Sequence, residues 1–313
     1  MTSRPGFEHE HEPPTFRRVF VVGCQRSGTT VIQSALARAS GLFTLPETHY
    51  FLDLLGGIEE WVKGDEAAFQ RKVRSRLRLA RGRTHREMRR DLGFILDKPE
   101  LGLRLRRHLR GAAYARAFAP LMDQAAQRLG YGGWIEKSPD HLAYIEYIRR
   151  FIPDARFVHV LRNGEDVIAS VIDAETRYAD AGIFRGGVAY WIERWNRAVA
   201  TSLRYAGRPG HWVLPLEDFL VRPQATMRAA CDFLGLPPGA ADGRWNWRNV
   251  ADIERQPWKS AAVDGKVRPP IRKFERMFGI ELRNRIRAQL RDYAQILAQL
   301  QPFLQRSAAG LRA

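Results

Sequence analysis

The chain has 313 residues, of which 45% are hydrophobic, and this is enough to build one sizeable α/β domain. It contains no apolar run near the roughly 18 residues that a membrane-spanning helix needs, and Met1 to Phe16 lacks an apolar signal segment. Cys24 and Cys231 are the only cysteines, which argues against a disulfide framework or a cysteine-based zinc site. These features predict a cytoplasmic protein.

The net charge of +17 is unevenly distributed along the chain. Residues 71–110 hold 15 lysines or arginines and 4 acids, so this span alone supplies +11. Such a basic face suits an anionic partner, which would be an acidic acceptor, an anionic membrane to which the protein binds peripherally, or nucleic acid. A solvated, arginine-rich helical face with no partner fits equally well.

Residues 1–15 are typical of a mobile tail, and residues 16–313 are expected to form a single domain. In the tail, His9 and His11 alternate with glutamates, but a flexible run of this kind is more often solvated than metal-binding. No metal site is expected.

The segment around residues 19–30 predicts a strand, a tight loop and a helix in immediate succession. Val19 to Val22 is a short apolar run, as expected for a parallel strand covered on both faces. Gly23 and Gly28 bracket four residues, and the two threonines that follow open a helix. Backbone N–H groups at such a helix start bind anions, so this segment predicts a phosphate-binding loop.

The loop differs from that of a nucleotide kinase in one informative position. Thr29 stands where a kinase has the lysine that contacts the outer phosphates, and the cation lies within the loop as Arg26. A planar guanidinium can bind a tetrahedral oxyanion in bidentate fashion. The loop therefore suits an anionic group, while a kinase-like phosphotransferase and a basic nucleic-acid-binding protein remain the alternatives.

A second short strand is predicted at residues 42–45, ended by Pro46. Glu47 and His49 then lie just beyond the carboxyl end of this strand, where open parallel sheets bind their ligands. Residues 52–130 are predicted to be a mostly helical, arginine-rich insertion or lid.

Three further strands follow the helical span. Residues 134–135 suit a buried strand that leads to Lys137, with Ser138 or Asp140 as the cap of the next helix and His141 as a hydrogen-bonded packing residue. Residues 156–161 form the clearest strand, and residues 212–216 a last, edge strand because they include Pro215.

Arg162 ends the strand at residues 156–161, and Ser170 lies two helical turns further on. One cation and one hydroxyl in this arrangement could converge on a second phosphate. The alternation of strands and helices predicts an α/β fold, a P-loop-like three-layer sandwich. Its central parallel sheet would have about four or five strands flanked by helices, plus the helical insertion.

Three motifs together resemble those of sulfotransferases that use 3′-phosphoadenosine 5′-phosphosulfate (PAPS). Gly23 to Thr30 resembles their 5′-phosphosulfate loop, and Arg162 to Ser170 is similar to their 3′-phosphate site. Glu136-Lys137-Ser138-Pro139 resembles the Lys-Ser/Thr-Pro pattern of many bacterial, protein-tyrosine and carbohydrate-type members. The resemblance covers roughly residues 17–240.

The resemblance implies transfer of a sulfonate group from PAPS to a hydroxyl acceptor, which would be a carbohydrate, a lipid or a small molecule. Arg162 and Ser170 would bind the 3′-phosphate, and Lys259 or Lys266 would close over the nucleotide. The residues implied at the 5′-phosphosulfate are Arg26, Ser27, Gly28, Thr29 and Thr30.

The resemblance also implies catalytic roles. Glu47 is the expected general base, provided that burial raises its pKa toward neutrality, and His49 is its rival. Arg26 and Lys137 would stabilise charge on the transferring group. The acceptor could be anionic, to match the basic span, and nucleic acid is not expected as a partner.

Overall fold

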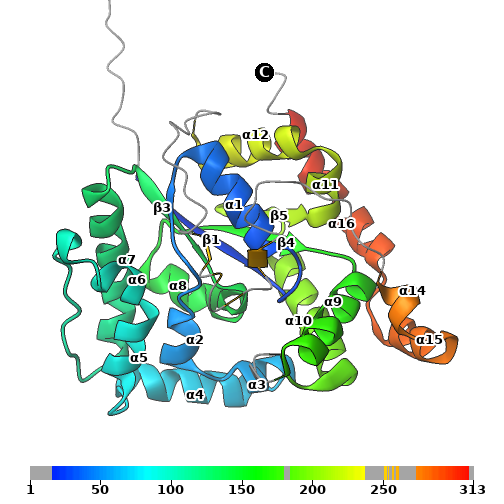
Figure 1. The fold of residues 1–313 in the computed structure, drawn as a ribbon, viewed down its shortest axis with the longest axis horizontal. Helices are drawn as coiled ribbons and strands as arrows, with labels where there is room; N and C mark the ends of the chain where they lie inside the picture. The colour runs from blue at the N-terminus through cyan, green and yellow to red at the C-terminus, as the bar shows by residue number, and fades with distance from the viewer. Residues whose placement is uncertain are drawn as a thin grey trace, which may run out of the picture.

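The structure is a computed structural model that describes residues 16–179, 184–236, 250–251, 253, 256, 259–260 and 273–309, with side chains up to residue 303. The predicted tail at residues 1–15 and the predicted nucleotide contact Lys266 lie outside the described residues. Across the described part of the chain, a five-stranded sheet lies between layers of helices (Figure 1). The predicted α/β fold with a central parallel sheet is therefore confirmed.

All strand pairs in this sheet are parallel, and the strand order is β2-β3-β1-β4-β5. The strands are β1 (Arg17–Gly23), β2 (Phe43–Thr44), β3 (Gly133–Lys137), β4 (Arg156–Leu161) and β5 (His211–Pro215). β1 lies at the centre, paired with β3 on one side and β4 on the other. Later strands are added on both sides of β1, so the strand order reverses at this strand. Folds of this kind bind ligands in the crevice beyond the carboxyl end of such a strand.

Both edge strands lie where the sequence predicts strands. β2 has only two residues, because the chain leaves β3 before Pro46. β5 is the opposite edge, as the proline at residue 215 indicated.

One face of the sheet is covered by α1 (Thr29–Ser40), α11 (Leu216–Val221) and α12 (Pro223–Leu234). Alternate strand residues such as Val19, Val21 and Val158 point into this layer.

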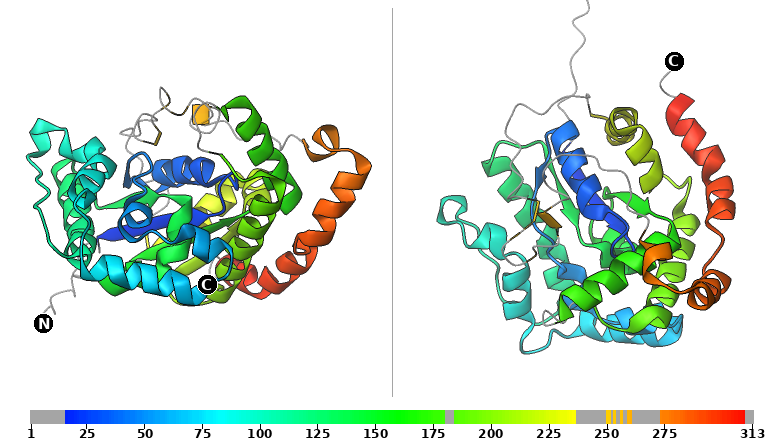
Figure 2. Two further views of the ribbon diagram at one scale, coloured as in Figure 1. Left: turned by 90° about the horizontal axis from the view of Figure 1, so that it is seen from below. Right: turned by 45° about the vertical axis from the view of Figure 1, so that its right-hand side comes forward.

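The other face is covered by the helices of the arginine-rich span together with α8 and α10 (Figures 1 and 2). Phe20 of β1 and Trp134 of β3 belong to the same buried cluster as Met88 and Phe118 of this layer. The span is therefore fused to the sheet through one continuous core. The elements of this whole layer are α2 (Tyr50–Leu55), α3 (Ile58–Val62), α4 (Glu66–Arg78), α5 (Thr84–Asp91), α6 (Gly93–Leu96), η1 (Pro99–Leu101), α7 (Gly111–Arg128), η2 (Pro139–Tyr144), α8 (Ile145–Phe151) and α10 (Gly187–Tyr205).

The remaining helices lie beyond β4 and β5. They are α9 (Gly164–Arg177), α14 (Phe274–Met277), α15 (Ile280–Gln289) and α16 (Tyr293–Ala309), and the last three wrap the side of the molecule (Figure 2). α9, α10, α14 and α15 share a smaller core. No helix in the described ranges has both the length and the apolar character needed to cross a membrane.

Candidate active site

The loop after β1 forms an open anion site at the start of α1. Arg26 and Gly28 adopt left-handed backbone conformations, with φ of 68° and 90°. A Cβ on Gly28 would lie 2.8 Å from the side chain of Leu216, so the turn requires glycine. No side chain caps the N-terminus of α1, which leaves its first N–H groups available to a ligand.

Two arginines meet at this loop. The Nε of Arg26 donates to the Oγ of Ser170 at 3.1 Å, and Arg162 donates to the backbone carbonyl of Arg26 at 3.1 Å. Burial, and next the Arg162 charge, lower the pKa of Arg26. Arg162 lies 3.8 Å from the carboxylate of Asp166, whereas Arg26 forms no ion pair with a carboxylate in the part of the chain that the structure describes. Its charge is therefore available to an anionic ligand.

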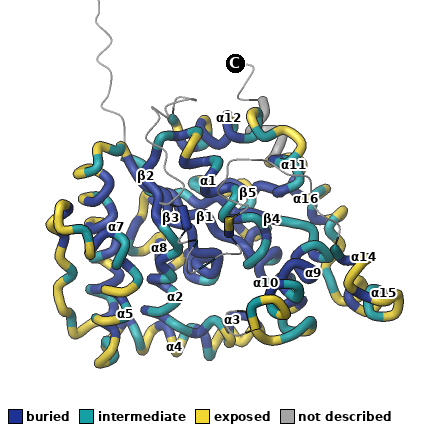
Figure 3. Tube along the Cα trace, in the orientation of Figure 1, coloured by how far each residue is buried: buried dark blue, intermediate teal, exposed yellow. Residues whose placement is uncertain are grey.

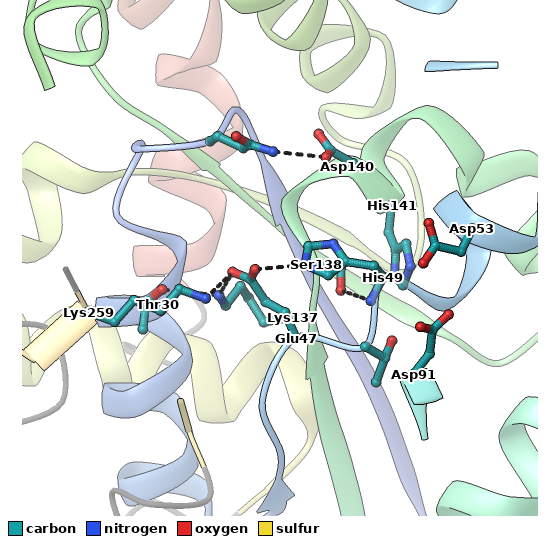
Figure 4. Close-up of polar contacts among 12 residues, drawn as sticks. Thr30, Glu47, His49, Asp53, Asp91, Lys137, Ser138, Asp140, His141 and Lys259 are labelled. Atoms are coloured by element: carbon teal, nitrogen blue, oxygen red, sulfur yellow. Dashed lines mark hydrogen bonds and ion pairs between the residues drawn. The ribbon is translucent and has the colours of Figure 1, made fainter. Parts of the chain in front are cut away.

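A second cluster surrounds the carboxylate of Glu47 (Figure 4). The fully buried Lys137 donates to Thr30 Oγ1 at 3.1 Å and forms an ion pair with Glu47 Oε1. Lys259 Nζ lies 2.8 Å from the same carboxylate oxygen. His49 Nε2 lies 3.2 Å from the other oxygen, Oε2. Glu47 thus holds two ammonium groups and one imidazole together.

These contacts decide the protonation of the cluster. Burial alone would raise the pKa of Glu47, but Lys137 and Lys259 outweigh it and hold that pKa well below its usual range. The expectation that burial brings Glu47 toward neutrality is therefore wrong for the ligand-free protein, because two cations face the carboxylate. Burial, followed by Lys137, lowers the pKa of Lys259 to about 7.

His49 is held in a defined orientation by the same carboxylate. Burial opposes its protonation, yet the hydrogen bond to Glu47 and the negative charges of Glu47 and Asp140 together outweigh burial, so the pKa of His49 is raised. Its other ring nitrogen, Nδ1, is buried and has no hydrogen-bond partner among the described residues. The backbone of His49 is left-handed, with φ of 53°, which the surrounding contacts must enforce.

Those contacts come from a buried network beneath the site. Glu136 is fully buried on β3, and its Oε1 accepts from Ser138 at 2.6 Å and Thr48 at 2.9 Å. His141 Nδ1 lies 2.8 Å from the other oxygen of Glu136. The Oγ of Ser138 in turn accepts from the backbone N–H of His49 at 3.0 Å. The network therefore fixes the backbone that presents Glu47 and His49.

Two predictions about this segment have opposite outcomes. Neither Ser138 nor Asp140 caps the next helix, since η2 begins without a side-chain cap. Ser138 is bonded to Glu136 instead, and Asp140 binds elsewhere. His141 does occupy a hydrogen-bonded packing position, because its Nε2 accepts from the backbone N–H of Phe51 at 3.2 Å.

Asp140 ties the loop to α10. Its Oδ2 accepts from Gln25 of the loop at 3.0 Å, and its Oδ1 forms a buried ion pair with Arg194. Sequence reasoning missed this pair and the Glu136 network. The available signal was a charged residue inside an otherwise apolar strand or helix face, since such a residue requires a partner.

The structure thus brings most of the predicted residues into two adjoining groups. One group consists of Arg26, Arg162 and Ser170 beside the loop. The other consists of Glu47, His49, Lys137, Thr30 and Lys259. Ser27 and Thr29 are buried, with exposed fractions of 1% and 4%, and the backbone N–H of Ser27 donates to the carbonyl of Cys24 at 3.2 Å within the loop.

Comparison with known proteins identifies the class. The model of the sulfotransferase family matches residues 18–240, and the chain therefore belongs to this family. Transfer of a sulfate group is accordingly its class of reaction.

Individual relatives are more distant. Protein-tyrosine sulfotransferase 1 of Danio rerio is 26% identical over 103 residues, which are 32% of this chain and 28% of that protein. The chain therefore matches well under a third of that relative's length. The sulfotransferase domain from the curacin biosynthetic pathway has the same fold, with a TM-score of 0.50 at 17% identity over 89% of this chain and 98% of that domain.

Proposed function

We propose that this sulfotransferase takes PAPS as its donor and transfers the sulfonate to a hydroxyl group of its acceptor. The observation that carries the proposal is the pair Arg26 and Arg162, whose positive charge adjoins an uncapped helix start. PAPS carries negative charge at two separate places, the 5′-phosphosulfate and the 3′-phosphate. A loop with one open anion site and an adjacent arginine pair fits both.

The two groups divide the work between them. Arg162 and Ser170 would bind the 3′-phosphate, and the loop N–H groups with Arg26 would hold the 5′-phosphosulfate. Lys137 stands at the junction, since it contacts Thr30 of α1 and Glu47 at once. We assign it to the charge that develops on the leaving phosphate and the sulfonate oxygens.

Glu47 is our proposed base for the acceptor hydroxyl, and His49 is its rival. In the ligand-free protein the ammonium groups of Lys137 and Lys259 keep Glu47 a weak base. An anionic donor competes for those ammonium groups, and their withdrawal raises the pKa of the carboxylate. Donor binding would then make Glu47 a stronger base only when a sulfonate is present to be transferred.

The direct test is incubation of cell extracts with the purified protein and PAPS, followed by mass spectrometry. A product heavier by one SO3 group, absent with a Lys137→Met control, supports the proposal. A phosphate ester of nearly the same mass would be told apart by its donor, because it would require ATP and magnesium in place of PAPS. Such a product, without any PAPS-dependent one, would overturn the proposal in favour of a kinase-like enzyme.

A further inference from the structure

One surface of the arginine-rich span combines apolar and basic side chains that have no role in the site. The N–H of Ala80 donates to the carbonyl of Leu109 at 2.8 Å, which joins residues 76–86 to residues 104–110. A Cβ on Gly111 would lie 2.1 Å from the carbonyl oxygen of Arg76, so the start of α7 packs directly on the end of α4. The two segments therefore form one continuous surface.

Two leucines project from this junction. Leu79 is 67% exposed and Leu109 is 84% exposed, and the Ala80–Leu109 hydrogen bond places them in neighbouring segments. Leaving such side chains in water forfeits the favourable free energy that their burial would give. Exposed apolar side chains that lie together mark contact surfaces more often than exposed apolar side chains that are scattered singly.

The same two segments contain nine arginines and no acidic residue. Arg81 and Arg83 pair with Glu87. Six others are exposed and form no ion pair with any residue that the structure describes, namely Arg78, Arg86, Arg104, Arg106, Arg107 and Arg110. Their charge is not neutralised within the protein, and this exposed region borders α4 and α5 in Figure 3.

We propose that this Leu–Arg surface, defined by Leu79, Leu109, Arg78, Arg106, Arg107 and Arg110, docks the protein on an anionic lipid membrane. Arginines attract acidic headgroups, and the two leucines can enter the acyl boundary beneath them. A nucleic acid duplex would engage the arginines alone. The leucines therefore favour the membrane.

Hydrogen bonds connect one segment of this surface to α2, the helix next to the active site. Arg76 and Arg81 donate to the backbone carbonyl of Asp53 in α2, at 3.1 Å and 3.3 Å. α2 starts directly after His49, and it is only six residues long. A membrane bound at this surface would thus lie near α2, the helix that follows Glu47 and His49. Binding to the membrane does not itself depend on the transfer reaction.

The experiment measures cosedimentation of the full chain with vesicles of phosphatidylcholine and phosphatidylserine, and with vesicles of phosphatidylcholine alone. The wild type should bind the anionic vesicles more tightly, and salt should weaken that binding. Replacing Arg78, Arg106, Arg107 and Arg110 with glutamine should reduce the partition coefficient by about tenfold or more. Leu79→Ser with Leu109→Ser should reduce it by about tenfold.

Matched controls separate a local surface from overall charge. Arg204, Arg222, Arg228 and Arg285 are also exposed, and their replacement by glutamine removes the same charge elsewhere. Val221→Ser with Ile280→Ser removes two exposed apolar side chains elsewhere. Both controls should keep wild-type binding.

Three results would overturn the proposal. The first is failure of the wild type to prefer anionic vesicles, and the second is equal loss in the surface and control variants. The third is tight binding to duplex DNA that ignores the leucine substitutions, with no vesicle binding. All variants alter exposed side chains, and thermal unfolding of each would show that the fold is intact.

Discussion

The active site and the Leu–Arg surface are both rich in cations, but they use them in opposite ways. In the site, Lys137 is fully buried and shares a carboxylate with Lys259, while Arg194 is buried against Asp140. On the surface, Arg78 and Arg107 are exposed and unpaired within the described residues. A buried charge is costly unless it is paired, whereas an exposed charge is solvated and remains free for a partner. Burial and pairing, more than residue type, therefore distinguish internal roles from external ones.

Of the effects that this contrast between buried and exposed charges predicts, the largest is a loss of turnover at Glu47. Glu47→Gln keeps the shape of the side chain but removes proton acceptance, so turnover should fall roughly 10²- to 10⁴-fold. Nucleotide affinity, measured by calorimetry, should be kept or should rise, because Lys137 and Lys259 lose the carboxylate that competes with the donor. If His49→Ala shows this loss while Glu47→Gln retains activity, the two assigned roles must be exchanged.

A comparable effect, on stability instead of rate, is expected at Arg194. Arg194→Met leaves Asp140 buried and unpaired, so the free energy of unfolding should fall by about 3–5 kcal/mol. Urea denaturation measures this change. The double variant Arg194→Met with Asp140→Asn should lose less, because no charge is left without a partner. A single variant as stable as the wild type would contradict the account of buried charge.

A smaller effect is expected from the buried histidines His159 and His211, whose ring nitrogens lie 3.0 Å apart. Burial lowers the pKa of His159 well below its usual range, and burial followed by Arg149 lowers the pKa of His211 to about 4. The unfolded chain therefore binds more protons below its histidine pKa of about 6.5, and stability falls as pH drops from there toward about 4.

His211→Phe should reduce this pH dependence by about one proton, or roughly 1.4 kcal/mol per pH unit near pH 5. Burial raises the pKa of Asp91 to about 7, which gives a dependence of opposite sign, so the comparison with wild type is what isolates the histidine. Thermal unfolding at pH 7 and pH 5 measures it. An unchanged difference between the two pH values would refute the assignment.

The smallest effect on stability is expected for the exposed arginines of the Leu–Arg surface. The variant with glutamine at Arg78, Arg106, Arg107 and Arg110 should unfold within about 0.5 kcal/mol of the wild type, since no internal ion pair is lost. A loss above about 2 kcal/mol in urea denaturation would show that these arginines are structural.

The sequence predicted what depends on local pattern. The strand at Val19–Val22, its glycine-bounded loop and the helix from Thr29 follow one another in the chain, so their structure could be inferred directly. The edge position of β5 followed from Pro215 alone. The positions of Glu47 beyond β2 and of Lys137 at the carboxyl end of β3 could likewise be inferred from the order of the elements.

What could not be predicted depends on partners distant in sequence. The pKa of Glu47 is set by Lys137 and Lys259, which lie 90 or more residues away along the chain. The hydroxyl of Ser138 is bonded to Glu136 and His49, and no local pattern distinguishes this from a helix cap. Exposure of Leu79 and Leu109 also emerges only when the end of α4 and the segment before α7 meet.

The central claim is that Arg162 and Ser170 read a 3′-phosphate on the donor nucleotide. Isothermal titration calorimetry with 3′-phosphoadenosine 5′-phosphate and with AMP tests it directly, because the two ligands differ only in that group. The wild type should bind the former more tightly by a few kcal/mol, and Arg162→Ala should abolish most of that difference. Equal affinities of the wild-type protein for the two nucleotides would contradict the account.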